Sequence, residues 1–251
     1  MDTPAAPDPW LALRALTPAR IALGRAGGSL PTGAHLEFQL AHARARDAVH
    51  DSFDVEALRH DLDAAGLPSI AVRSAAADRK TYLQRPDLGR RLDSGSREPL
   101  VAAAVEGGFD AVIVVSDGLS ARAALRHAVP LLAALAPRLR ADRWRLAPVV
   151  IAERARVALS DEIGFLLGCR LALILLGERP GLSAPDSLGG YLTWDPRRGR
   201  TDAERNCVSN IRPEGLTYHS AADRLGFLMT EARRRRLTGV ALKEESGVLG
   251  A

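Results

Sequence analysis

Charged and polar side chains follow several short apolar runs of this sequence, at the point where each run ends. They are Ser116 and Asp117 after residues 110–115, Glu153 and Arg156 after residues 147–152, and Glu178 and Arg179 after residues 171–176. Carboxylates accept hydrogen bonds and guanidinium groups bind anions, so this set suits a polar or charged ligand. The same residues also suit ordinary turns that water solvates. At each single loop, the spacing alone leaves both interpretations open.

Cys207 is a further candidate, in a polar stretch that also holds Arg205 and Arg212. Neighbouring guanidinium groups lower the pKa of a thiol and make it reactive. A neutral thiol is instead a small side chain that packs closely against a ligand or a partner. The sequence leaves both roles open for Cys207 and favours the second.

We find no arrangement of residues that would form a reaction centre. The loop at residues 118–120 lacks the glycine-x-serine-x-glycine turn of serine hydrolases. No predicted strand is followed by glycine-x-glycine-x-x-glycine, the pattern of dinucleotide-binding proteins. The glycine-rich residues 22–33 lack the lysine of a phosphate-binding loop. His35, His42 and His50 have no carboxylate partners at metal-ligand spacing. The sequence therefore predicts a binding platform with no catalytic residue and no metal ligand of its own.

The apolar runs themselves predict buried parallel strands. Residues 171–176 have no polar alternation, which is typical of a strand covered on both faces, and further strands are expected at residues 69–72, 110–115 and 147–152. Helical segments separate them, so we expect parallel pairing with right-handed crossovers. The carboxyl ends of parallel strands meet at one edge, where open α/β sheets bind ligands. The polar residues after the strands should therefore converge on one ligand site.

The other segments complete an α/β fold. Helices at residues 32–49 and 54–65 make residues 1–67 a small N-terminal helical domain. Residues 68–251 are expected to form a Rossmann-like α/β domain, which is a parallel sheet flanked by helices. Beyond Gly181 we expect irregular structure with an edge strand at residues 191–193, a polar loop or short strand at residues 201–215, and a final amphipathic helix at residues 220–237.

Composition narrows the class of protein. The 251 residues are 47% hydrophobic and 25% charged, as in globular proteins, and no apolar run approaches the roughly 20 residues of a membrane span. The net charge is only +4, and no nucleic-acid-binding pattern accompanies the basic run at residues 233–236, so we expect no nucleic-acid partner. Two cysteines and no signal peptide predict a cytoplasmic location.

Five blocks of the sequence resemble one known family. They are ALTPARIALGRAGGSLPT at residues 15–32, DRKTYLQRPDLGRRL at 78–92, VVSDGLSA at 114–121, LLGERPGLSAPDSLGGYLTW at 175–194 and TDAERNCVSNIRPEGL at 201–216. In this order they resemble the light chain, or small subunit, of ethanolamine ammonia-lyase. The resemblance extends from Trp10 to the last predicted helix.

The resemblance implies a function that the residues alone do not indicate. Enzymes of this family use adenosylcobalamin to convert ethanolamine to acetaldehyde and ammonia by a radical mechanism. The large subunit binds substrate, and the light chain forms part of the cobalamin site in a hetero-oligomer. The resemblance also raises a bacterial microcompartment as an alternative location.

The residues also allow an alternative function. The chain would then be a stand-alone α/β enzyme that acts on a phosphorylated small metabolite, with Arg156 and Arg179 binding the anion.

Family contacts with the cofactor map onto three positions of this chain. The resemblance implies that Val157, Glu178 and Cys207 bind cobalamin. Glu178 would accept hydrogen bonds from the amide side chains of the corrin, and the small Cys207 would approach the ring closely. The aspartate-x-histidine-x-x-glycine motif, which replaces the base below cobalt in other enzymes, is absent from the chain. We therefore expect base-on binding, with the cofactor's own benzimidazole on cobalt.

Overall fold

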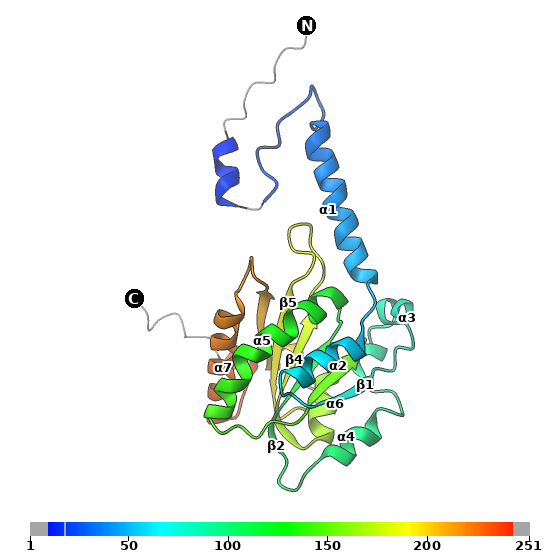
Figure 1. The fold of residues 1–251 in the computed structure, drawn as a ribbon, viewed down its shortest axis with the longest axis vertical. Coiled ribbons are helices and arrows are strands. Elements are labelled where there is room, and N and C mark those ends of the chain that lie inside the picture. The colour runs from blue at the N-terminus through cyan, green and yellow to red at the C-terminus, as the bar shows by residue number, and fades with distance from the viewer. Residues whose placement is uncertain (1–9, 18, 243–251) are drawn as a thin grey trace, which may run out of the picture.

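The structure of this chain is a computed structural model that describes residues 10–17 and 19–242. Six strands form one sheet in the order β1-β3-β2-β4-β5-β6 (Figure 1). The strands are β1 (Ser69–Arg73), β2 (Phe109–Ser116), β3 (Val149–Glu153), β4 (Cys169–Gly177), β5 (Leu188–Trp194) and β6 (Arg205–Ile211). The first four pair in parallel, as their uninterrupted apolar runs predict.

The last two strands differ from the prediction. β5 runs antiparallel to both of its neighbours, and it lies between β4 and β6 instead of at the edge. Residues 205–211 of the polar stretch form the edge strand β6. Val208 and Ile211 point into the core while the residues around them are polar, because helices cover only one face of this strand. The sheet is therefore mixed, with four parallel strands and an antiparallel extension.

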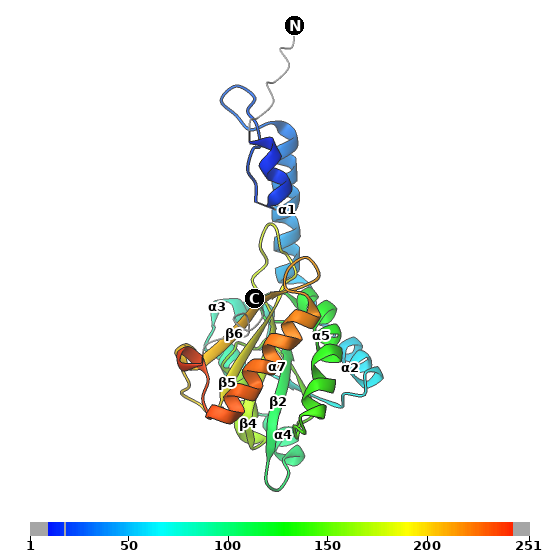
Figure 2. The same cartoon turned by 90° about the vertical axis from the view of Figure 1, so that its left-hand side faces the viewer.

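Helices cover the two faces of the sheet unequally (Figures 1 and 2). One face carries α2 (Val55–Ala64), α5 (Ala121–Ala141) and α7 (Tyr218–Arg235), and the other carries α4 (Arg97–Ala103) and α6 (Leu159–Leu166). Alternate residues of β4 supply both cores. Leu171, Leu173 and Leu175 belong to the first core, while Ala172, Ile174 and Leu176 belong to the second.

Short elements join these layers. They are α3 (Arg79–Gln84) and the 3₁₀ turns Leu11–Leu16, Leu88–Arg90, Asp202–Glu204 and Gly239–Ala241.

Side chains cap several helices at their amino ends. Asp54 accepts a hydrogen bond from the Ala57 amide (2.9 Å), and Ser120 accepts one from the Ala123 amide (3.3 Å). No helix among the described residues is long and apolar enough to cross a membrane.

An N-terminal arm projects from the rest of the molecule. We define the arm as residues 10–17 and 19–50; it ends in helix α1 (Thr32–His50) and extends away from the sheet in both views (Figures 1 and 2). Helix α2 packs on the sheet instead, and its Leu58 and Leu62 lie in the same core as the strands. The division into domains at residue 67 stays a prediction.

Candidate functional site

Two of the polar residues at the predicted edge hold the loops there together. The buried Asp117 accepts hydrogen bonds from the Arg154 amide (2.6 Å) and from the Ser116 hydroxyl (3.0 Å), and it pairs with Arg79 (2.9 Å). Burial raises the pKa of Asp117, and the positive charge of Arg79 opposes that rise. The Ser116 side chain also accepts a hydrogen bond from the Ala155 amide (3.0 Å). Ser116 and Asp117 thus connect the ends of β2 and β3 and are turned inward from the surface.

Arg156 is held in a fixed position after β3. Its guanidinium group lies 4.2 Å from the centre of the Tyr82 ring, and its Nη2 donates to the Tyr82 carbonyl (3.1 Å). Gly89 lies against its stem, where an added Cβ would be 2.8 Å from Arg156 Cγ. A side chain at Gly89 would force Arg156 to shift, so glycine allows the close approach of the 88–90 turn. Glu153 pairs with Arg154 (2.9 Å) on the other side of this loop.

A cleft of about 750 Å³ opens beside this loop. It is lined by residues of three segments of the chain, namely Asp87, Arg90, Arg91, Arg156, Val157, Ala158, Asp161, Arg198, Gly199, Arg200, Thr201 and Asp202. Arg90, Arg91 and Arg156 form no ion pair with any residue that the structure describes. The cleft therefore has excess positive charge, which suits an anionic group. Val157 lies in its wall, whereas Arg179 is exposed and does not line it.

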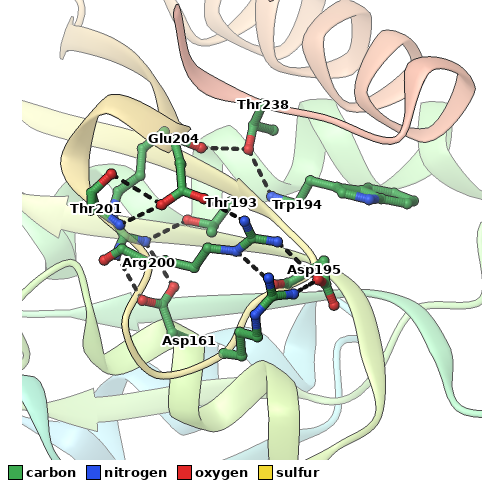
Figure 3. A network of polar contacts seen from close by, with 10 residues as sticks. Asp161, Thr193, Trp194, Asp195, Arg200, Thr201, Glu204 and Thr238 are labelled. Carbon is green, nitrogen blue, oxygen red and sulfur yellow. Dashed lines mark hydrogen bonds and ion pairs between the residues drawn. The ribbon is translucent and has the colours of Figure 1, made fainter. Parts of the chain in front are cut away.

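A network of polar contacts that includes Asp161, Thr193 and Arg200 lies at the cleft (Figure 3). Arg205 donates two hydrogen bonds to Asp161 (2.8 and 2.7 Å) and one to Thr193 (2.6 Å). Burial lowers the pKa of Arg205, but the hydrogen bonds and charge of Asp161 outweigh it and leave the pKa above its ordinary value. Arg200 bonds to Glu204 and to Asp195. These pairs fix residues 195–205 against α6.

Glu178 and Cys207 come together around Tyr191. Tyr191 of β5 is the register partner of Cys207 of β6, so their side chains lie on the same face. Oε2 of Glu178 accepts a hydrogen bond from the Asn210 amide (3.1 Å), which fastens the end of β4 to β6. An added Cβ at Gly189 would lie 2.9 Å from Oε1 of Glu178. Glycine at this position therefore leaves room for the carboxylate over β5.

This cluster lies on the open part of the sheet. Helix α7 packs on the opposite face of β5 and β6, and Cys207 and Ser209 are exposed. Tyr191 is half-buried against the core that α6 covers, and Val157 packs against the same core. All three predicted contact residues therefore lie on one side of the sheet. Glu178 and Cys207 are neighbours, and Val157 lines the cleft beside them.

The thiol of Cys207 is not activated. Partial desolvation raises its pKa, and hydrogen bonds with Ser209 and Tyr191 only partly offset the rise. Burial and then the nearby Cys207 and Glu178 also raise the pKa of Tyr191. Arg205, which suggested activation in the sequence, is turned toward Asp161 instead. The structure thus favours the neutral, closely packing role for Cys207 over the reactive one.

Sequence reasoning missed several residues of this site. The sequence places Tyr191 only in an expected edge strand, Gly189 in the irregular segment before it, and Arg90 and Arg91 in a polar stretch. The glycine pair beside a lone tyrosine was the available signal, because glycines inside a strand mark a close approach of backbone or ligand. Their role became visible only when β5 was placed between β4 and β6.

Comparison with known proteins identifies the family. Residues 7–243 match the family described as ethanolamine ammonia-lyase light chain. The chain belongs to that family. It is 60% identical over 248 residues to the ethanolamine ammonia-lyase small subunit of Azotobacter vinelandii, covering 98% of this chain and 92% of the relative. It is 58% identical over 251 residues to the small subunit of Ralstonia nicotianae, covering 98% and 93%.

The described residues include no group of three or more histidine, cysteine, aspartate or glutamate side chains arranged to hold a metal ion. His127 is engaged by the Tyr218 hydroxyl (2.8 Å) and the Asp186 carbonyl (2.7 Å). What the site does offer is an open polar surface around Glu178, Tyr191 and Cys207, next to an arginine-rich cleft.

Proposed function

We propose that this chain is the small subunit of an adenosylcobalamin-dependent ethanolamine ammonia-lyase. In this proposal it forms one wall of the cobalamin site, and a large subunit binds ethanolamine, which the complex converts to acetaldehyde and ammonia. The match to the light-chain family over residues 7–243 carries the proposal. The surface around Glu178, Tyr191 and Cys207 supports it, because it is open to a partner on the ligand-binding edge of the sheet.

The residues present fit a corrinoid. Adenosylcobalamin is a large flat ring with amide side chains and one phosphodiester in its nucleotide loop. Glu178 Oε2 is engaged by the Asn210 amide, which leaves acceptor capacity on the carboxylate for amide donors of the ring. Cys207 is exposed and neutral, so it allows close approach without competing for cobalt. The unpaired arginines in the cleft beside Val157 suit the phosphodiester.

The chain itself binds and orients. When bound, adenosylcobalamin supplies the radical chemistry. Glu178 and Cys207 hold one side of the ring, Val157 supplies an apolar contact, and the body of the subunit excludes water from that side. No side chain of this subunit is proposed as a catalytic residue or a cobalt ligand. The cofactor therefore binds base-on in this proposal.

A reconstitution experiment tests the function. The chain is purified alone and together with a large subunit, and ethanolamine deamination is measured with adenosylcobalamin. We expect activity only from the mixture. Activity from the chain alone, or no activity from a mixture that forms a stable complex, would contradict the proposal. An electron paramagnetic resonance spectrum with a protein histidine nitrogen on cobalt would contradict base-on binding.

The arginine cleft also supports a second candidate, a stand-alone enzyme that acts on a phosphorylated small metabolite. Arg90, Arg91 and Arg156 would bind the phosphate, in place of the pair Arg156 and Arg179 that the sequence suggests. This candidate predicts that inorganic phosphate binds the lone chain and that an Arg156→Met substitution abolishes binding. Isothermal titration of the lone chain with phosphate measures this directly. Location in the cytoplasm or in a microcompartment stays a prediction.

A further inference from the structure

Large apolar side chains are exposed mainly in one part of the molecule, the arm. Among the described residues, thirteen large apolar side chains are exposed, and eight of them belong to the arm. The eight are Trp10, Leu11, Leu13, Leu16, Leu30, Leu36, Phe38 and Leu40. Exposed apolar surface of this density in a globular protein marks a site of interaction.

The arm has almost no core of its own. Ala48, at the base of α1, is the one buried residue of that helix, and the 3₁₀ turn Leu11–Leu16 contains none. Leu36 and Leu40 lie one turn apart on one side of α1, and Phe38 stacks on His42 on another. Apolar residues on more than one side of a projecting helix fit a partner that encloses it. Helices in proteins obtain most of their stability from such packing.

The arm contacts the loop at the edge of the sheet where the proposed cofactor site lies. Nη2 of Arg20 donates to the carbonyl of Leu182 (3.4 Å), in the loop between β4 and β5 that begins at Glu178. Figures 1 and 2 show this loop rising beside the lower end of α1. Leu182 is itself an exposed apolar residue. A body that covers the Glu178 edge would therefore also meet the arm.

The charge of the arm favours a different chain over a second copy. The arm contains five arginines and only two carboxylates, Glu37 and Asp47. Two such arms packed together would place like charges next to each other, which is unfavourable. An apolar groove with acidic residues on its rim would satisfy both the leucines and the arginines.

We propose that the arm docks into an apolar, acid-rimmed groove of the large subunit and clamps that subunit over the cofactor edge. This inference rests on the proposed function, because the large subunit is the partner that function requires. The inference names the arm as the part of the chain that docks, with Leu36, Phe38 and Leu40 as its contact residues. The body then presents Glu178 and Cys207 to the cofactor, while the arm supplies affinity between subunits.

The test compares two charged variants in complex formation. Leu36→Glu/Leu40→Glu places charges on the exposed side of α1, and Phe165→Glu is the control, an exposed apolar residue near the end of α6. Each variant is purified as the full chain and titrated with the large subunit by sedimentation velocity. We expect the double variant to bind at least about 100-fold more weakly, because two leucines lose their burial and two charges are desolvated. We expect Phe165→Glu to bind like the wild type.

Further measurements separate the possible failures. The thermal unfolding of the lone double variant should match that of the wild type, because neither leucine packs in the body. Wild-type affinity in the double variant, with an active wild-type complex, would overturn the docking inference and leave the proposed function standing. A lone chain whose self-association the double variant abolishes, with the complex unaffected, would identify a second copy as the occupant and also overturn it. A wild-type chain that never binds the large subunit would overturn both proposals.

Discussion

The body and the arm of this chain use leucine in opposite ways. In the body, β4 buries Leu171, Leu173 and Leu175 completely, and the helices on that face cover them. In the arm, Leu36 and Leu40 of α1 are about half exposed. Both segments are rich in leucine, but only β4 has surfaces of the same chain to pack on. Amphipathic spacing therefore predicts a helix without saying which molecule covers it.

The largest difference between the two regions should come from charge burial. Arg205→Met leaves the carboxylate of Asp161 buried without its partner, which costs about 3–5 kcal/mol. Arg14→Met in the arm is the matched control, because Arg14 is exposed and should change the free energy of unfolding by less than about 0.5 kcal/mol. Urea unfolding of both lone chains measures the two values. Equal losses would remove the distinction between body and arm.

Truncating leucines tests the same distinction with apolar residues. Leu173→Ala opens a cavity in the core between the sheet and α5, and we expect a loss of about 2–5 kcal/mol in the free energy of unfolding. Leu36→Ala should lower it by less than about 0.5 kcal/mol in the lone chain, because the side chain is already exposed. A large loss from Leu36→Ala would show that the arm has a core contact within the chain.

Removing the Glu178 carboxylate should affect the cofactor more than the fold. Glu178→Ala removes a hydrogen-bond acceptor at the proposed site, and we expect adenosylcobalamin to bind the assembled complex about 10-fold more weakly. Glu106→Ala is the control, because Glu106 is exposed at the opposite edge of the sheet. Equilibrium binding of the cofactor to the two complexes provides the comparison. Unchanged affinity in Glu178→Ala would mean that the body serves only as a scaffold.

The smallest expected effect concerns the thiols of the body. Burial raises the pKa of Cys207 and raises that of Cys169 to about 12, so both carry less thiolate than a free thiol at any given pH. At about pH 8 we expect iodoacetamide to modify Cys207 more slowly than free cysteine, and the rate to rise as pH increases. Mass spectrometry with Cys207→Ser as the control identifies the site. Alkylation faster than that of free cysteine would show an activated thiol.

The sequence predicted those parts of the fold that depend on neighbours along the chain. The four parallel strands were found because residues such as 171–176 are continuous apolar runs, and this pattern requires cover on both faces. The sequence predicts only a loop or a short strand where β6 lies, because the polar residues Asn206, Ser209 and Asn210 interrupt the apolar pattern. An edge strand with one open face has apolar residues on the other face only, so its sequence lacks the continuous apolar run of a strand that is covered on both faces.

The candidate site shows the same limit. The positions of Glu178 at the end of a strand and of Val157 after another were predicted, but their neighbours were not. Glu178 meets Cys207 because β5 inserts antiparallel between β4 and β6 and places Tyr191 beside the thiol. Such strand order depends on contacts between segments far apart in the sequence, which local periodicity does not report.

By itself, the sequence determined the elements, the parallel strands and the polar residues at their ends, because each follows from the spacing of residues within a few positions. The tertiary structure alone decided which polar residues turn inward, as Asp117 does, and which stay open to a ligand, as Glu178 does. It also decided that α2 joins the core while α1 projects from it. The physical reason is that burial depends on the whole surface available for packing, and that surface exists only once the sheet has formed.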